Sequence, residues 1–132
     1  MRHLIVMLSL LVPCVGDAAN VPTGTWVVKQ QIAFDIYRCQ EAACGKVVWL
    51  RNPAERTMCG RVIIWGLTTD DSAQWDGGWF YNPEDGKTYN LKATVENPDR
   101  ISARIYKITP LFGRTEILTR IRPHSLAGWC AG

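Results

Sequence analysis

Eight short runs of residues that favour β-strands, separated by brief turn-forming segments, restrict the fold of this 132-residue chain more than any other feature. In the clearest run, residues 32–39, the apolar Ile32, Phe34 and Ile36 occupy every second position. That period of two is typical of a strand with one face in a core and the other in water. None of the runs has a helical period, and they cover residues 24–30, 32–39, 45–50, 61–67, 78–81, 88–96, 101–108 and 115–122.

The connections between these runs are short, which restricts how the strands can pair. The polar segments 40–43, 51–60 and 68–74 are predicted to be loops. Consecutive strands joined by short turns are antiparallel neighbours, and eight of them can close on themselves so that no strand edge is exposed. The predicted all-β fold is therefore an eight-stranded antiparallel up-and-down barrel, with a β-sandwich as the alternative.

The segment 75–89 carries the most specific turn chemistry in the chain. The side chain of Asn82 can accept from backbone amides two residues further on, and Pro83 fixes φ at the value that a tight turn needs. Gly86 can adopt the positive φ that closes such a turn. Because β-favouring residues lie on both sides, we predict a β-hairpin in which these three residues have a structural role.

Residues 1–19 are predicted to be a signal peptide, with Arg2 and His3 before the apolar stretch 4–12 and small residues before the expected cleavage site. The stretch is too short to span a bilayer. Lipidation of Cys14 is the alternative, and Pro13 disfavours it because such signals need a small residue there. We therefore expect a periplasmic or secreted protein that does not span a membrane.

Beyond the signal peptide we expect one barrel domain, residues 20–124, followed by a C-terminal tail, residues 125–132. Four cysteines remain there, an even number that fits an oxidising compartment. Three pairings are possible; we favour Cys39 with Cys44, which could face each other across a hairpin, and by elimination Cys59 with Cys130. The spacing lacks the close Cys-x-x-Cys pairs typical of structural zinc sites, so no metal is expected.

Six tryptophans offer large aromatic surfaces. We predict that Trp26, Trp49 and Trp65 fill the barrel interior. Trp75 and Trp79 flank two consecutive glycines, Gly77 and Gly78. Glycine lets backbone or ligand approach closely, so this segment is a candidate ligand site. Aromatic walls with a few polar groups are typical of ligand pockets. The candidates for contact with a ligand are Trp75, Gly77, Gly78, Trp79, Tyr81 and Tyr89.

Nothing in the sequence indicates catalysis, a cofactor or nucleic-acid binding. The one histidine after the signal peptide, His124, has no partner placed by the sequence, so no catalytic constellation is visible and an enzyme is not expected. The net charge is +3, and the basic residues are scattered rather than gathered into a nucleic-acid-binding patch. The acidic residues of the loops lack the spacing of an EF-hand calcium site; they are Asp70, Asp71, Asp76, Glu84 and Asp85.

Several motifs together resemble a bacterial exported family catalogued as domain of unknown function 2147. They are Gly24-x-Trp26, the segment 44–50 that follows Cys39, the hairpin 75–89 and the segment 112–116. The resemblance implies a lipocalin-like (calycin) barrel, a periplasmic or secreted location and no established activity. It also implies that the tryptophan of Gly-x-Trp plugs the closed end, beneath a basic residue of the last strand, Arg120 or Arg122. The chain departs from the family in a shorter connection at 52–60 and in the added tail.

These observations leave two functional hypotheses. The first is a binding module that holds a small apolar or amphipathic ligand, because eight-stranded barrels are just wide enough to hold one. The alternative is a cell-envelope interaction or inhibitor-type protein that acts through exposed loops. An exposed patch built from Trp75, Trp79 and Trp129 would favour the alternative.

Overall fold

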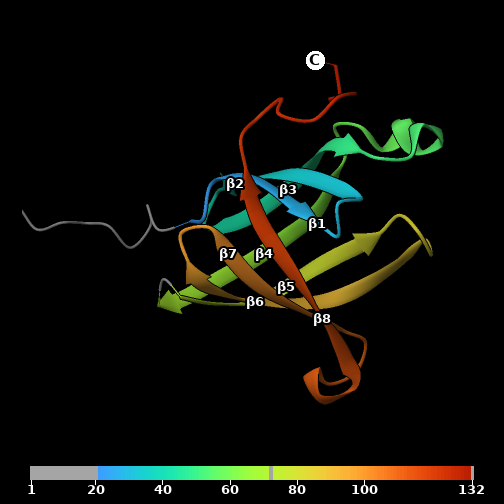
Figure 1. The fold of residues 1–132 in the computed structure, drawn as a ribbon. Coiled ribbons are helices and arrows are strands. Elements are labelled where there is room, and N and C mark those ends of the chain that lie inside the picture. Colours follow the sequence, from blue (N-terminus) through green and yellow to red (C-terminus); the bar gives the residue numbers. More distant parts are fainter. Residues whose placement is uncertain (1–20, 72, 132) are drawn as a thin grey trace, which may run out of the picture.

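The structure is a computed structural model that describes residues 21–71 and 73–131, and its strands form one closed barrel in the order β1 to β8 (Figure 1). Every neighbouring pair is antiparallel, and β1 pairs with β8 to close the sheet. The predicted eight-stranded up-and-down barrel is confirmed. Its strands are β1 (Gly24–Val28), β2 (Ile32–Cys39), β3 (Ala42–Leu50), β4 (Val62–Asp71), β5 (Gln74–Asn82), β6 (Lys87–Asn97), β7 (Arg100–Tyr106) and β8 (Gly113–Ile121).

The predicted signal peptide, residues 1–19, lies outside the described residues. Within the described part of the chain, no helix is long and apolar enough to cross a membrane. Two 3-10 helices occupy the longer connections, η2 (Pro53–Met58) and η3 (Pro110–Phe112). Each begins with proline, whose missing N–H costs nothing at the start of a helix, and each is capped by the residue before it.

The prediction of a loop at 68–74 is wrong, because β4 runs on to Asp71 and β5 begins at Gln74. The Asp71 carboxylate accepts from the amides of Ala73 and Gln74 at 2.8 and 3.2 Å, which replaces a loop by a tight turn. Short polar side chains favour such local bonds. The acidic character that indicated a loop therefore serves a turn between two long strands.

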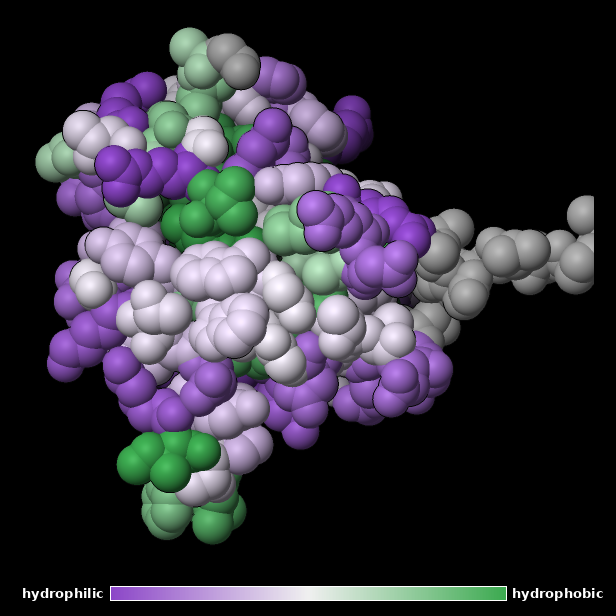
Figure 2. Space-filling view, turned by 180° about the vertical axis from the view of Figure 1, so that it is seen from behind, coloured by the Kyte–Doolittle hydropathy of each residue, from purple (hydrophilic) through white to green (hydrophobic). Residues whose placement is uncertain are grey.

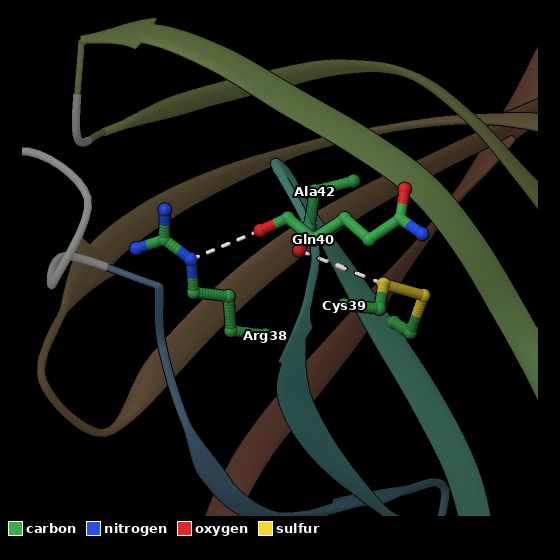
Figure 3. Close-up of a disulfide and its surroundings, with 5 residues drawn as sticks. Arg38, Cys39, Gln40 and Ala42 are labelled. Carbon is green, nitrogen blue, oxygen red and sulfur yellow. Dashed lines mark hydrogen bonds between the residues drawn. A yellow bond between two sulfur atoms is a disulfide. The ribbon is translucent and has the colours of Figure 1, made fainter.

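The four cysteines pair as the sequence favours, Cys39 with Cys44 and Cys59 with Cys130. The first disulfide crosses the tip of the β2–β3 hairpin, where the Arg38 side chain donates to the carbonyl oxygen of Gln40 at 3.0 Å (Figure 3). The second joins the end of η2 to the C-terminal tail. Two disulfides are consistent with an oxidising compartment.

The end of the barrel where β1 begins is closed by Trp26, which is fully buried and donates from Nε1 to the carbonyl oxygen of Pro22 at 3.0 Å. The Arg120 guanidinium lies over the indole, with its carbon 4.4 Å from the ring centroid. Arg120 is thus the basic residue of the last strand at this place. Gly24 has φ +132°, and a Cβ there would lie 2.2 Å from Arg120 Nη1, so only glycine leaves room for this arrangement.

Trp49 lies outside the barrel, so the prediction that it fills the interior is wrong. The β2–β3 register shifts between Ala33 and Phe34, because Val48 is an extra residue on β3. Such a bulge changes which side chains point inward. Trp49 joins an outer cluster that the C-terminal tail covers, and its Nε1 donates to the carbonyl oxygen of Ala127 at 2.8 Å. The outer cluster comprises Val27, Ala33, Val48 and Trp49, with Ile121, Leu126 and Trp129 packed against it.

Trp65 is also wrongly predicted to fill the interior. It is half-buried and packs against Trp79 of the neighbouring strand, with ring centroids 6.2 Å apart. The Trp79 ring lies over Gly66, where a Cβ would come within 2.8 Å of a ring carbon. Of the six tryptophans, only Trp26 and Trp75 belong to the interior core cluster. The interior therefore lacks the indoles of Trp49 and Trp65, which were predicted to fill it.

Candidate functional site

A cavity of about 110 Å³ lies inside the barrel, and every strand contributes to its wall. An engineered apolar cavity of about 150 Å³ holds a benzene molecule, so this space suits a ligand no larger than one ring or a short acyl chain. The wall is mainly aliphatic and aromatic because the inward positions of each strand are apolar. Typical members of the wall are Phe34, Ile36, Leu67, Trp75, Leu91 and Ile105.

One end of the cavity is polar, which gives the site two chemically different parts. This end is the mouth, where the β1–β2, β3–β4, β5–β6 and β7–β8 connections meet. Lys29 Nζ lies 3.0 Å from Glu116 Oε1, and Arg114 Nε lies 3.4 Å from the same oxygen. Glu116 is only 9% exposed, so its carboxylate is one of the few buried charges in the fold. Two cations neutralise it at the entrance.

The turn of the hairpin 75–89 shapes the same mouth. Asn82 is buried, and its side chain accepts from the amide of Glu84 at 3.0 Å. The amide of Gly86 donates to the carbonyl oxygen of Asn82 at 2.8 Å, and Gly86 has φ +71°. The turn has the predicted local bonds. In addition, Asn82 and Pro83 border the cavity, which the sequence did not indicate.

The residues proposed to contact a ligand are not gathered in one place. Trp75 is 4% exposed and, of the six candidates, is the one in the cavity wall. Gly78 lies beneath Leu67, where a Cβ would come within 2.6 Å of Leu67 Cγ. Gly77 has φ +74° in the irregular part of β5, and Trp79 is 44% exposed on the outer wall. Gly78 thus allows close packing of β4 on β5, whereas Gly77 supplies the positive φ of the irregular part of β5.

Tyr81 and Tyr89 are half-buried side chains that pack at the edge of the core cluster. The patch of Trp75, Trp79 and Trp129 does not form, because the first is inside the barrel and the last packs in the outer cluster. His124 lies beside Trp129, with ring centroids 5.1 Å apart. Within residues 21–71 and 73–131, no group of three or more His, Cys, Asp or Glu side chains is placed to hold a metal ion.

Tyr89 lies near the mouth, where its hydroxyl donates to the Asp85 carboxylate. Lys107 Nζ lies 4.8 Å from the centre of its ring, and a second, more open pocket of about 200 Å³ lies between Tyr89 and Phe112. The hydrogen bond from Tyr89 holds the pKa of Asp85 below its ordinary value of 3.8. The same bond raises the pKa of Tyr89 above 10.0.

Replacing Tyr89 by phenylalanine is expected to raise the pKa of Asp85 toward 3.8, because the carboxylate loses its strongest donor. In the intact protein the bond stabilises the fold above about pH 4, and this contribution is lost as the pH falls through the lowered pKa of Asp85. The raised pKa of Tyr89 implies a contribution present below about pH 10 and lost as the pH rises. An NMR titration of the Asp85 carboxyl carbon measures the shift. Tyr81→Phe is the control, and an equal shift in both variants would contradict the assignment.

Sequence reasoning missed the charged residues of the mouth. Glu116 lies two residues before Leu118 on β8, and both side chains face the interior. The alternation along β8 could therefore have predicted a carboxylate inside the barrel. Arg114 lies two residues before Glu116 on the same face of β8, so it was equally readable. Lys29 carried no such signal, because its contact with Glu116 depends on how β1 and β8 close the barrel.

A closed eight-stranded antiparallel barrel with an indole plug at one end and an apolar cavity open at the other is a lipocalin-like barrel. Among solved structures the chain resembles protein HP1028 from the human pathogen Helicobacter pylori, described as belonging to the lipocalin family. The TM-score is 0.63 at 15% identity, over 76% of this chain and 83% of that one, which is a likeness of fold alone. The chain belongs to the family described as "uncharacterized protein conserved in bacteria", domain of unknown function 2147, whose model matches residues 24–120. The search of curated proteins finds no match.

Proposed function

We propose that this protein is an exported binding module that holds one small apolar or amphipathic ligand inside the barrel. The observation that carries the proposal is the cavity of about 110 Å³ with an apolar wall and a charged mouth. Binding pockets combine predominantly apolar walls with a few well-placed polar groups, and this cavity has both. The proposed role is binding rather than catalysis.

The mouth supports an amphipathic ligand in particular. An apolar tail gains by leaving water for the aliphatic wall, by about 0.8 kcal/mol for each buried methylene group. A polar head would then remain at the entrance, beside Lys29, Arg114 and Glu116. Two cations lie at 3.0 and 3.4 Å from one carboxylate oxygen, so their remaining positive charge suits an acidic head group next to Glu116.

Export is supported by the two disulfides, because such bonds persist mainly in oxidising compartments. The signal-like segment at residues 1–19 gives the same expectation. A periplasmic or secreted location is therefore part of the proposal, and N-terminal sequencing of the protein recovered from the envelope fraction tests it. A start near residue 20 would support export, and a chain that begins at Met1 in the cytoplasm would contradict it.

Filling the cavity is expected to abolish ligand binding. Ala103→Leu adds three carbon atoms at a position in the cavity wall. The larger side chain reduces the volume left for a ligand, so a ligand can bind only if that side chain moves. We expect affinity to fall by at least about tenfold, the equivalent of roughly 1.4 kcal/mol. Calorimetric titration with short fatty acids and aromatic carboxylates measures the affinity.

Ser102→Leu is the matched control, because Ser102 adjoins Ala103 on β7 but faces away from the cavity. This variant adds a similar side chain to the outer wall and should bind as the unchanged protein does. Equal affinities for Ala103→Leu and Ser102→Leu would show that the ligand does not occupy the barrel. Thermal unfolding of both variants checks that each is folded.

Interaction with the cell envelope through exposed loops is the second candidate, and one observation favours it. The connection between β7 and β8 exposes three large apolar side chains, Ile108, Leu111 and Phe112. Monomeric proteins seldom gather such side chains on one projecting turn without a partner for them.

A further inference from the structure

The β7–β8 connection projects from the mouth end of the barrel and carries an apolar tip, which we define as Ile108, Leu111 and Phe112. The three residues are 89%, 77% and 77% exposed. In Figure 1 the connection, in brown, extends below the barrel at η3. Figure 2 shows a strongly apolar group, in green, at the corresponding lower end of the molecule. The tip is convex and stands clear of the barrel wall.

The tip is held in place by several hydrogen bonds. Thr109 caps η3 by accepting from the amide of Leu111 at 3.0 Å. Arg104 donates to the carbonyl oxygens of Pro110 and Leu111 at 2.8 and 3.3 Å, which fastens the turn to β7. At its base a Cβ on Gly113 would lie 2.3 Å from the carbonyl oxygen of Ile105, so the chain approaches β7 as closely as glycine allows. The backbone is thus fixed while the apolar side chains point into water.

Basic residues surround the tip on the same end of the barrel. Lys107 precedes it and lies over the Tyr89 ring, and Arg114 follows it. Lys29 lies on the β1–β2 connection, and Lys87 lies at the start of β6. The carboxylates of this end are partly engaged: Asp85 with the Tyr89 hydroxyl and Glu116 with Lys29 and Arg114, whereas Glu55 and Glu84 are the remaining acidic groups. An apolar tip that is flanked in the chain by Lys107 and Arg114 is complementary to an anionic lipid surface.

We propose that the apolar tip docks the protein onto an anionic phospholipid bilayer, with Ile108, Leu111 and Phe112 below the lipid head groups. Lys107 and Arg114 then lie at the level of the lipid phosphates. A bilayer fits the tip better than a protein does, because stable protein interfaces need about 800 Å² from each partner and this surface is one convex turn.

Docking of the apolar tip on a bilayer does not depend on a ligand in the cavity. It is tested by co-flotation of the protein recovered from the envelope with vesicles of phosphatidylglycerol and phosphatidylcholine or of phosphatidylcholine alone. We expect the unchanged protein to float with the anionic vesicles and to bind them less in high salt. Leu111→Asp and Phe112→Asp are each expected to weaken binding by at least about tenfold, because each removes one apolar side chain from the bilayer.

Ala73→Asp is the matched control, because it makes the same change of charge at an exposed position on the opposite, closed end. It should bind anionic vesicles as the unchanged protein does. All forms share one N-terminus, so any contribution of the segment before residue 20 cancels. Ala103→Leu should also bind as the unchanged protein does, which separates docking from the cavity proposal.

Absence of binding by the unchanged protein, or equal losses in the tip variants and in Ala73→Asp, would overturn the proposal. The tip variants should keep the thermal midpoint of the unchanged protein, because both side chains are largely in water. Loss of binding with that midpoint unchanged supports docking through the tip.

Discussion

Replacing Cys59 and Cys130 together by alanine is expected to lower the free energy of unfolding by roughly 4 kcal/mol, as judged by urea unfolding. The disulfide joins residues 71 positions apart. On the chain-entropy model, freeing so long a loop gives the unfolded chain many additional conformations. A loss of this size is a large part of the 5 to 15 kcal/mol by which domains are ordinarily stable.

The position of this disulfide adds a structural reason for a large effect. It fastens the tail whose Leu126 and Trp129 cover the outer cluster, and the amide of Cys130 donates to the carbonyl oxygen of Val48 at 2.8 Å. A freed tail would expose Trp49, which is only 5% exposed in the intact fold. We therefore expect a red shift of tryptophan fluorescence in the folded variant.

The Cys39–Cys44 disulfide is the matched control. It closes a loop of only 5 positions, so its removal by two alanines is expected to cost roughly 2 kcal/mol on the same model. It also lies at the tip of a hairpin that strand pairing already holds together. If its removal costs as much as that of Cys59–Cys130, neither loop length nor the tail explains the stability.

Trp26→Ala is expected to destabilise the protein by about 3 to 5 kcal/mol, the usual range for removing a large aromatic side chain from a core. Trp26 is fully buried at the closed end. The variant loses the hydrogen bond to Pro22 and leaves the Arg120 guanidinium without the ring beneath it. Arg120 also donates to the carbonyl oxygens of Thr23 and Pro98, at 2.8 Å in each case, so the loss extends to two connections.

Two further variants show whether Trp26 acts as a plug. Trp26→Phe keeps most of the apolar volume and is expected to cost less than the alanine variant. Trp79→Ala removes an indole that is 44% exposed on the wall and should cost clearly less than Trp26→Ala. Thermal or urea unfolding of the three variants gives the order. An equal cost for Trp26→Ala and Trp79→Ala would contradict the role of Trp26 as the closure of the barrel.

Much of the fold could be predicted from local patterns, because a strand and a tight turn each depend on neighbouring residues. The inward row of β2, Ile32, Phe34 and Ile36, is visible as a simple alternation. The turn at Asn82 and Gly86 is visible as residue types with the required backbone freedom. The even number of cysteines and the hairpin around Cys39 and Cys44 likewise favoured the observed pairing.

The site was less predictable, because its residues come from strands distant in sequence. Trp75 was a candidate and lies in the wall, whereas Trp79 was a candidate and lies outside. The difference follows from the irregular pairing of β5 around Gly77, where the strict alternation of faces is interrupted. A sequence that is read with a constant period of two cannot show at which residue the inward face changes.

Local residue patterns were enough to predict the strands, their turns and an antiparallel barrel as the leading fold. Contacts between distant segments then determined which indoles lie inside the barrel. One extra residue in β3 turned Trp49 outward, and the pairing of β4 with β5 placed Trp65 beside Trp79 on the outer wall. The C-terminal tail covers the outer cluster, which would otherwise be an exposed apolar patch. The physical reason is that alternation is a local property, whereas register and coverage depend on contacts between segments far apart in the chain. Those contacts left the interior open as a cavity.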